Sequence, residues 1–302
     1  MNIGVVLVTF NRLEKLKTSL EHLESQSLLP KHVVIVDNAS TDGTSEYLSQ
    51  WCTTCQKFTV QILTMPTNCG GSGGYYAGMD EIIKYPVDWV WLQDDDVYAD
   101  KDAFAVAMDS LATINDPQIV SLSSKVITKG EVSLVHRRYV TKRFLDVKEK
   151  NCPLEYYKQE YFKLDLITFA GAFISKSAIE KVGLPEKDFF IWQDDTEYCY
   201  RLLKIGSLYC VPNVVIEHDV DEKQDTGISW KSYYGWRNEM IKYQKHFSVF
   251  VYSFKILKRL VNGIFFLYKH GSIGAKVWYS ALFDGIKGVR GLHAVYKPGW
   301  KP

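Results

Sequence analysis

The stretch Trp89–Val97, with the sequence WVWLQDDDV, constrains the fold of this chain more than any other. An apolar run there ends abruptly in three consecutive carboxylates, Asp94, Asp95 and Asp96. Continuous hydrophobicity of this kind is typical of a strand buried on both faces, in the middle of a largely parallel sheet. Ligands of open α/β sheets bind just beyond the carboxyl ends of such strands. The sequence therefore predicts a ligand site at this position.

Three adjacent negative charges repel one another, so the cluster predicts a bound cation. On an extended segment Asp94 and Asp96 would face one way and Asp95 the other. Two carboxylates on one side offer the hard oxygen ligands that Mg²⁺ and Mn²⁺ prefer. A solvated acidic turn is the alternative interpretation. The preceding strand favours the metal, because it aims the carboxylates at the ligand-binding edge of the sheet.

Strands and helices alternate in the first part of the chain. Apolar strands are predicted at 3–8, 33–36 and 58–63, with a leucine-periodic helix after the first, capped by Asn11 and Glu14. This alternation predicts a doubly wound, mostly parallel α/β sheet. The chain has 302 residues, of which 46% are hydrophobic, so it can bury a sizeable core and is not globally disordered.

A glycine-rich segment, Asn68–Gly78, opens a predicted helix. Glycines allow a ligand to approach the backbone closely, and a helix N-terminus offers N–H groups to a phosphate. The spacing matches neither a P-loop nor a dinucleotide fingerprint. A flexible turn is the alternative, but glycines that run into a helix favour the ligand interpretation.

A second carboxylate pair, Asp194 and Asp195, follows the apolar residues 189–192 at a predicted helix start. Asp194 is either an N-cap or a functional residue. Asp195 is a candidate general base, because a lone carboxylate beside a metal site can activate a hydroxyl. Strands are predicted at 208–211 and 214–217. His218 follows the second of them and is a candidate metal ligand, although a lone histidine is more often structural.

The net charge of +1 hides an asymmetry, because residues 231–302 carry 13 Lys and Arg against 2 Asp and Glu. This basic, aromatic and helical extension predicts contact with an anionic membrane surface or, equally, a helical oligomer interface. We therefore divide the chain into a catalytic domain, 1–230, and an extension, 231–302. Six cysteines without a second close pair, and no secretory signal, predict a cytoplasmic protein that acts there or at the inner face of the cell membrane.

Together these motifs resemble the family 2 glycosyltransferases, which have the GT-A nucleotide-sugar-binding fold. The resemblance covers roughly residues 3–220 and is carried by VVLVTFNR, VVIVDNASTDGT, NCGGSGGYYAGM, WLQDDDV, FAGAF, WQDDTEYCYR and IEHD, in this order. The combination NCGGSGG, QDDD and WQDD is most similar to the galactofuranosyltransferase-like branch, and rhamnosyltransferases share much of it.

The resemblance implies a role for each candidate residue. Asp195 would be the catalytic base, and Trp192, Asp194 and Gly171 would shape the acceptor site. The metal ligands would be Asp94, Asp96 and His218, although the extra Asp95 leaves the exact pair of aspartates open. The nucleotide-sugar donor would be bound by Thr9, Phe10, Arg12, Asp37, Asn68, Gly70, Gly71, Gly73, Gly74 and Asp95.

The resemblance thus implies a metal-dependent, inverting glycosyltransferase that uses Mn²⁺ or Mg²⁺. The expected reaction moves galactofuranose from UDP-galactofuranose to a hydroxyl of a growing, lipid-linked bacterial surface polysaccharide. A rhamnosyl donor such as dTDP-rhamnose, or another hexosyl donor, is the alternative. A non-catalytic, membrane-associated sugar-binding scaffold is a distant second, and no nucleic acid partner is expected.

Overall fold

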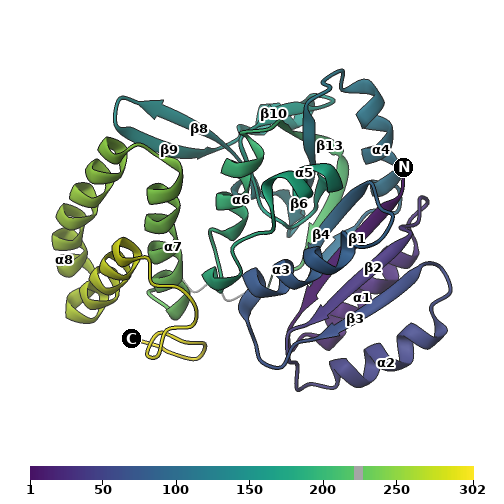
Figure 1. Ribbon diagram of the computed structural model, residues 1–302, viewed down its shortest axis with the longest axis horizontal. Coiled ribbons are helices and arrows are strands. Elements are labelled where there is room, and N and C mark those ends of the chain that lie inside the picture. Colours follow the sequence, from purple (N-terminus) through teal and green to yellow (C-terminus); the bar gives the residue numbers. More distant parts are fainter. Residues whose placement is uncertain (221–226) are drawn as a thin grey trace.

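The structure, a computed structural model, describes residues 1–220 and 227–302. Figure 1 shows an α/β body with a helical C-terminal part beside it. The central sheet has ten strands among the described residues, and its main path runs β10-β13-β6-β12-β4-β1-β2-β3. These strands are β1 Ile3–Thr9, β2 His32–Asp37, β3 Thr59–Thr64, β4 Trp89–Asp94, β6 Ile119–Thr128, β10 Phe162–Leu164, β12 Ala172–Ser175 and β13 Ser207–His218; β5 Val97–Ala99 and β7 Glu131–Val132 pair at the side.

Strands β1, β2, β3 and β4 pair in parallel, as do β6 and β13, whereas β12 runs antiparallel between β4 and β6. The predicted mostly parallel α/β fold is confirmed. One apolar core lies on each face of the sheet, which is why β1 and β4 are buried on both sides. The helices that cover the sheet are α1 Leu13–Glu24, α2 Thr44–Thr54, α3 Gly70–Ile82, α4 Ala103–Thr113, α5 Lys176–Val182 and α6 Asp194–Leu202.

Two local predictions were wrong. Asn11 does not cap α1: the N-cap position is Arg12, and Asn11 Oδ1 accepts a hydrogen bond from Thr41 N at 2.7 Å. The strands predicted at 208–211 and 214–217 form one strand, β13, whose pairing with β6 shifts register between Val211 and Val215. An irregularity inside one strand looks like a break when only the sequence is read.

A small second sheet, β11-β8-β9, lies between the body and the C-terminal helices (Figure 1). It consists of β8 Arg137–Arg143, β9 Asp146–Asn151 and β11 Leu166–Ile167. The short 3₁₀ turns are η1 Leu134–His136, η2 Leu154–Lys158 and η3 Lys187–Phe189. Residues 126–165 thus hold a β-hairpin, formed by β8 and β9.

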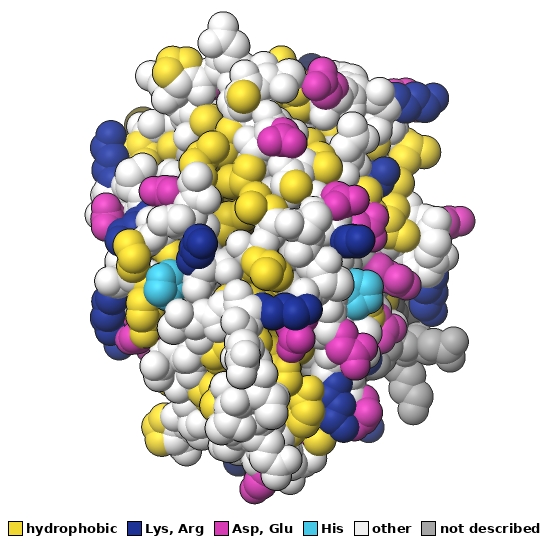
Figure 2. Space-filling view, turned by 90° about the vertical axis from the view of Figure 1, so that its right-hand side faces the viewer, with side chains coloured by type: hydrophobic (Ala, Val, Ile, Leu, Met, Phe, Trp, Pro, Cys, Tyr) yellow, Lys and Arg dark blue, Asp and Glu magenta, His cyan; other side chains and the backbone are white. Residues whose placement is uncertain are grey.

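The C-terminal part consists of α7, Trp230–His246, and α8, Val249–Lys287, which is broken at Gly271 where φ is 67°. These helices pack on each other, and α7 also packs on α6 and contacts η3 through Asn238 and the carbonyl of Phe189. No helix in residues 1–220 or 227–302 is long and apolar enough to cross a membrane. The face of the body on the side away from α8 mixes charges of both signs with apolar side chains (Figure 2). The boundary at 230/231 stays a prediction.

Candidate active site

The aspartate cluster lies at the carboxyl end of β4, as predicted. Only Asp94 belongs to the strand; Asp95 and Asp96 form the tight turn into β5. The alternation expected for an extended segment therefore does not apply to them. Instead, each carboxylate is held by its own set of neighbours.

Asp95 is tied to the end of β1. Its Oδ2 accepts from Thr9 Oγ1 at 2.8 Å and from Phe10 N at 3.2 Å. Arg12 Nη1 lies 3.3 Å from Asp95 Oδ1 and 2.5 Å from Asp96 Oδ2, so one guanidinium bridges both carboxylates. Burial raises the pKa of Asp95 to about 7, although Arg12 opposes the rise.

The other two carboxylates face different partners. Tyr75 Oη donates to Asp94 Oδ1 at 2.8 Å, and His218 Nε2 lies 3.3 Å from Asp96 Oδ1. Burial and the neighbouring charge of Asp96 raise the pKa of Asp94 to about 6. Burial would raise the pKa of Asp96 as well, but His218 and Arg12 outweigh it and hold it below its usual value.

His218 itself is raised in pKa, because the attraction of Asp96 and Asp94 exceeds the effect of burial. The ring of His136 stands edge-on to it, with centroids 5.1 Å apart. Burial lowers the pKa of His136 to about 3, so this ring is neutral and does not compete for the carboxylates. His136 Nδ1 lies 2.8 Å from Thr168 Oγ1.

The donor atoms here suit a divalent cation. Asp94 and Asp96 supply the hard carboxylate oxygens that Mn²⁺ and Mg²⁺ prefer. His218 adds an imidazole nitrogen, which a transition metal such as Mn²⁺ accepts more readily than Mg²⁺ does. His218 Nδ1 is buried and makes no hydrogen bond within the described part of the chain, and Asp96 Oδ1, also buried, is contacted there by His218 Nε2 as an ion pair. Nevertheless, among the residues that the structure describes, no group of three or more His, Cys, Asp or Glu side chains is arranged so that it could hold a metal ion. The residues fit the ion by their chemistry, and their assignment as ligands stays a prediction.

A cleft of about 760 Å³ opens over this cluster. Predicted site residues that line it are Thr9, Phe10, Arg12, Asn68, Gly70, Gly71, Asp94, Asp95, Asp96, Trp192 and His218. Segments 8–12, 68–71, 94–96 and 218–220 follow strands, and they meet here because the carboxyl ends of parallel strands share one edge of the sheet. Segments 190–192 and 229–232 also line the cleft. The cleft can hold a ligand of nucleotide-sugar size.

The glycine-rich segment serves two purposes. Gly70 and Gly71 line the cleft, and Gly70 has a φ of 73°. Gly73 and Gly74 lie outside it: a Cβ at Gly74 would come within 2.5 Å of Val8 on β1. Glycine at that position is therefore explained by close packing of α3 on the sheet.

Residues 189–193, here called the aromatic loop, contribute Phe190, Ile191 and Trp192 to the lining of the cleft. Phe190, Trp192 and Gln193 have positive φ values of 68°, 64° and 72°. Each such conformation costs about 1–3 kcal/mol in a non-glycine residue. The carbonyl of Phe190 accepts from Ser72 N at 3.2 Å, and a Cβ on Gly70 would lie 1.9 Å from that carbonyl oxygen. The aromatic loop and the glycine-rich segment thus fit together directly.

The second carboxylate pair opens α6 directly after this loop. The N-cap position belongs to Gln193, and Asp194 is the first helical residue. Burial and the charge of Asp195 raise the pKa of Asp194 to about 7. Burial raises the pKa of Asp195 also, against the opposing charge of Arg138.

A polar chain runs from Asp195 to the C-terminal helices. Thr196 N and Oγ1 donate to Asp195 Oδ1 at 2.5 and 2.9 Å, and Arg138 Nη2 donates to Thr196 Oγ1 at 2.8 Å. Arg138 pairs with Glu149 at 2.5 Å, and Glu149 with the buried Lys242 at 2.5 Å. Asp195 is therefore held in a defined orientation, with a positive charge nearby.

A comparison of the sequence with models of protein families shows which family the chain belongs to. The family model described as glycosyl transferase family 2 matches residues 4–183, more than half of the chain. The chain belongs to glycosyl transferase family 2. The resemblance inferred from the motifs is confirmed, and so is the prediction of a glycosyltransferase at the level of the family.

Two curated relatives support the predicted branch of glycosyl transferase family 2. The galactofuranosyltransferase GlfT1 of Mycobacterium tuberculosis (strain CDC 1551 / Oshkosh) is 29% identical over 206 residues, which are 68% of this chain and 66% of GlfT1. The dTDP-rhamnosyl transferase RfbF of Shigella flexneri is 27% identical over 153 residues, which are 44% of this chain and 49% of RfbF. The chain thus matches only part of the length of each relative.

Solved structures agree on the fold. S. aureus TarS 1-349 in complex with UDP-GlcNAc has a TM-score of 0.62 at 16% identity, and the match covers 96% of this chain and 82% of that one. GalNAc-T7 with UDP, GalNAc and Mn²⁺ has a TM-score of 0.62 at 12% identity and covers 81% of this chain and 48% of that one. At these identities the likeness shows the fold alone.

Two predicted site residues of this family 2 chain are engaged in the fold. Asp37 is fully buried, and its carboxylate accepts from Ser40 N at 2.9 Å and from Ser45 Oγ. Gly171 forms a bend with φ 71°, and a Cβ there would lie 2.3 Å from Ser124 Oγ. Their contributions to nucleoside and acceptor binding stay predictions.

Sequence reasoning also missed several residues of the cleft. Asn38, at the end of β2, directs the glycine-rich segment by accepting from Cys69 N at 3.0 Å. Its place directly after a strand was a signal that could have been used. The C-terminal part contributes further residues to the lining, for which the sequence held no signal: Ser229, Trp230, Lys231, Ser232 and Pro298.

Proposed function

We propose that this chain is a metal-dependent, inverting galactofuranosyltransferase. It transfers galactofuranose from UDP-galactofuranose to a hydroxyl of a growing, lipid-linked surface polysaccharide. The observation that carries the proposal is the carboxylate cluster Asp94–Asp96, which lies at the end of β4 in a cleft of nucleotide-sugar size. The second pair, Asp194 and Asp195, does not line this cleft but opens α6 directly after the aromatic loop that does. The sequence identity of 29% with the galactofuranosyltransferase GlfT1, over 68% of the chain, supports the choice of sugar.

On the donor side, Thr9, Phe10 and Arg12 bind the nucleoside end, and Asn68 with Gly70 and Gly71 contacts the diphosphate or sugar. Asp94, Asp96 and His218 would hold the divalent ion. When bound, such an ion neutralises the charge that develops on a diphosphate leaving group. A nucleoside diphosphate then leaves without a general acid, so one carboxylate is enough for the chemistry.

On the acceptor side, Asp195 takes the proton from the attacking sugar hydroxyl. A raised pKa makes a carboxylate a better base near neutral pH, provided that it is still ionised. The Arg138 charge supports that ionised form. The oxygen of the acceptor attacks the anomeric carbon, the bond to the nucleotide breaks, and the anomeric configuration inverts.

Rhamnosyl transfer from dTDP-rhamnose is the second candidate, favoured by the match to RfbF over 153 residues.

The test offers the purified protein UDP-galactofuranose, dTDP-rhamnose and other nucleotide sugars with Mn²⁺ or Mg²⁺ and glycan acceptors. We expect metal-dependent nucleotide release and sugar transfer from UDP-galactofuranose, abolished by Asp96→Ala. Transfer from dTDP-rhamnose alone would replace the donor assignment.

The role of Asp195 has a separate test. Asp195→Asn should keep donor affinity within about twofold and lower kcat by about 10²–10⁴-fold, the range of a lost general base. Equal loss of donor binding and turnover would contradict the assignment of Asp195 as the base.

For the C-terminal part we propose contact with an anionic membrane surface. An exposed apolar stripe runs along the first half of α8, with Phe250 and Phe265 each 70% exposed and Tyr268 95% exposed. The tip of the β8–β9 hairpin adds Phe144, 87% exposed, beside the exposed Lys142 and Arg143. Lys258 Nζ ties α8 to this hairpin through Asp146 at 3.0 Å, so both lie on one side of the molecule (Figure 1). Apolar and aromatic side chains with basic neighbours suit anionic lipid headgroups.

Cosedimentation of the full chain with vesicles measures this contact. We expect binding to phosphatidylglycerol-containing vesicles but not to phosphatidylcholine alone, and its loss in Phe250→Ser/Phe265→Ser. Phe283→Ser, at another exposed position of α8, is the control. A concentration-dependent dimer that the double variant dissociates, without vesicle binding, would instead favour the oligomer interface.

A further inference from the structure

The aromatic loop owes its strained form to α7, and not to its own sequence alone. Three of its five residues have a positive φ. A different but overlapping set of three, Phe190, Ile191 and Trp192, lines the cleft. Side chains that rarely adopt such backbone angles keep them only when surrounding structure over-determines them. The contacts that do so come largely from one face of α7.

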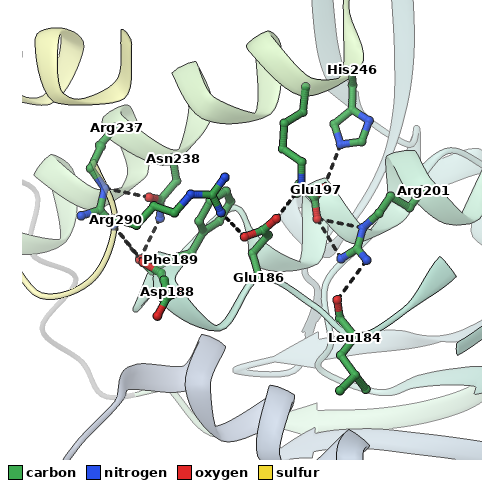
Figure 3. A network of polar contacts seen from close by, with 11 residues as sticks. Leu184, Glu186, Asp188, Phe189, Glu197, Arg201, Arg237, Asn238, His246 and Arg290 are labelled. Carbon is green, nitrogen blue, oxygen red and sulfur yellow. Dashed lines mark hydrogen bonds and ion pairs between the residues drawn. The ribbon is translucent and has the colours of Figure 1, made fainter. Parts of the chain in front are cut away.

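Asn238 lies at the centre of these contacts and is fully buried. Its Nδ2 donates to the carbonyl oxygens of Phe189, Ile191 and Trp192 at 2.9, 3.1 and 2.9 Å. Its Oδ1 accepts from Arg237 Nε at 3.0 Å, which fixes the orientation of the amide. A flipped amide would place an oxygen against three carbonyls, so this orientation is the one that satisfies its partners. Figure 3 shows Asn238 and Arg237 reaching from α7 towards Phe189.

Two neighbouring positions on α7 complete the contact. Gly235 lies against the indole of Trp192, since a Cβ there would come within 2.8 Å of Trp192 Cε3. Lys242 Nζ donates to Gln193 Oε1 at 2.7 Å. One helix of the C-terminal part thus holds the backbone of the loop, the ring of Trp192 and the residue that precedes Asp194.

We propose that Asn238 and Gly235 are positioning residues for the acceptor. Asn238 holds the backbone of the aromatic loop, and Gly235 leaves room for the indole of Trp192 at the wall of the cleft. The C-terminal part therefore determines how the acceptor sugar is oriented toward Asp195. This inference rests on the proposed function for its catalytic consequence, but the holding of the loop is independent of it.

A purely structural role would predict something different. Loss of an α7 contact would then lower thermal stability and reduce all activities together. A positioning role predicts a change in acceptor KM and kcat while donor affinity stays the same, because misplacing a bound reactant by about 1 Å costs up to about 10²-fold.

The sharpest variant is Gly235→Ala, which pushes on the ring of Trp192 while alanine favours the helix over glycine. We expect unchanged melting, donor Kd within about twofold, and acceptor KM raised about tenfold. In a Trp192→Ala background the ring is gone, so Gly235→Ala should change acceptor KM by less than about twofold. Equal effects in both backgrounds, or none in either, would overturn the role of Gly235.

Hydrogen exchange of the full chain tests Asn238 without turnover. Asn238→Asp places a carboxylate against three carbonyl oxygens, and we expect faster exchange in 189–193 at about the wild-type rate elsewhere in the body. Asn262→Asp, the same change at an exposed position of α8, is the matched control. If Asn238→Asp does not fold, Asn238→Ala replaces it. Wild-type exchange in 189–193 in the folded variant would overturn the proposal, whereas absence of transfer by the wild type would contradict only the proposed function.

Discussion

Glu197 on α6 is the most heavily paired carboxylate between the body and the C-terminal helices. It is fully buried and lies 2.9 Å from Arg201 Nη2, 2.8 Å from Lys245 Nζ and 2.9 Å from His246 Nε2. Figure 3 shows it between α6 and α7. Burial alone would raise the pKa of Glu197, but the hydrogen bond from His246 and the charge of Arg201 outweigh it and lower the pKa to about 2.

The size of the effect follows from linkage. A fall in the pKa of Glu197 from 4.5 to about 2 corresponds, at about 1.4 kcal/mol per pH unit, to about 3 kcal/mol of stability. Because the pKa is depressed in the folded state, this stability is complete above the unfolded pKa. It is lost as the pH falls through the folded pKa. At pH 3 roughly 1.5 kcal/mol remains.

Urea unfolding of wild type and Glu197→Gln at pH 7, 5 and 3 measures this difference. We expect Glu197→Gln to be less stable by about 3 kcal/mol at pH 7 and by roughly half of that at pH 3. Glu160→Gln, the same change at an exposed position, is the control and should differ from wild type by less than about 0.5 kcal/mol at each pH.

A difference between wild type and Glu197→Gln that stays constant from pH 7 to pH 3 would refute this reasoning. It would mean that the loss comes from packing and not from the ionised carboxylate. A difference under about 1 kcal/mol at pH 7 would show that desolvation cancels the gain from the three partners of Glu197, as it can in buried ion pairs.

Two further predictions concern glycine and arginine positions. Gly70→Ala should abolish donor binding or folding, because the added Cβ would lie 1.9 Å from the carbonyl oxygen of Phe190. Gly71→Ala, whose Cβ would have no atom within 4 Å, should fold and melt like wild type. Differential scanning fluorimetry and nucleotide-sugar titration compare the two variants. Arg137→Lys should lower the free energy of unfolding by about 2–4 kcal/mol. The buried guanidinium donates to Ser124 O at 2.8 Å and to the carbonyls of Ala170 and Gly171, and lysine cannot make these hydrogen bonds together. A loss under about 1 kcal/mol, measured by urea unfolding, would contradict this.

Much of the donor side was predictable from the chain itself. Hydrophobic runs of the length of β1 and β4 are typical of strands buried on both faces of a mostly parallel sheet, and the polar residues that follow such strands meet at one edge. Thr9, Arg12 and Asp94–Asp96 therefore converge as expected. The turn at Asp95 and Asp96 was not predictable, because three aspartates in a row carry no signal of where the strand stops.

The acceptor side could be predicted less well from the sequence. Positive φ values at Phe190, Trp192 and Gln193 contradict local preference, and they are held by tertiary contacts. The contacts from α7, such as that of Asn238 with Trp192, come from more than forty positions later in the chain. A sequence pattern reports local preference and burial, so it cannot reveal a conformation imposed from a distance.

The sequence by itself determined the α/β fold, the family and the carboxylates at the strand ends, because hydrophobic periodicity and short motifs are local properties. Only the tertiary structure decided how the C-terminal part takes part in the site. There α7 holds the aromatic loop, and Lys231 and Pro298 line the cleft. The physical reason is that buried polar groups must find partners wherever the fold brings them together, and those partners are set by packing and not by position in the chain.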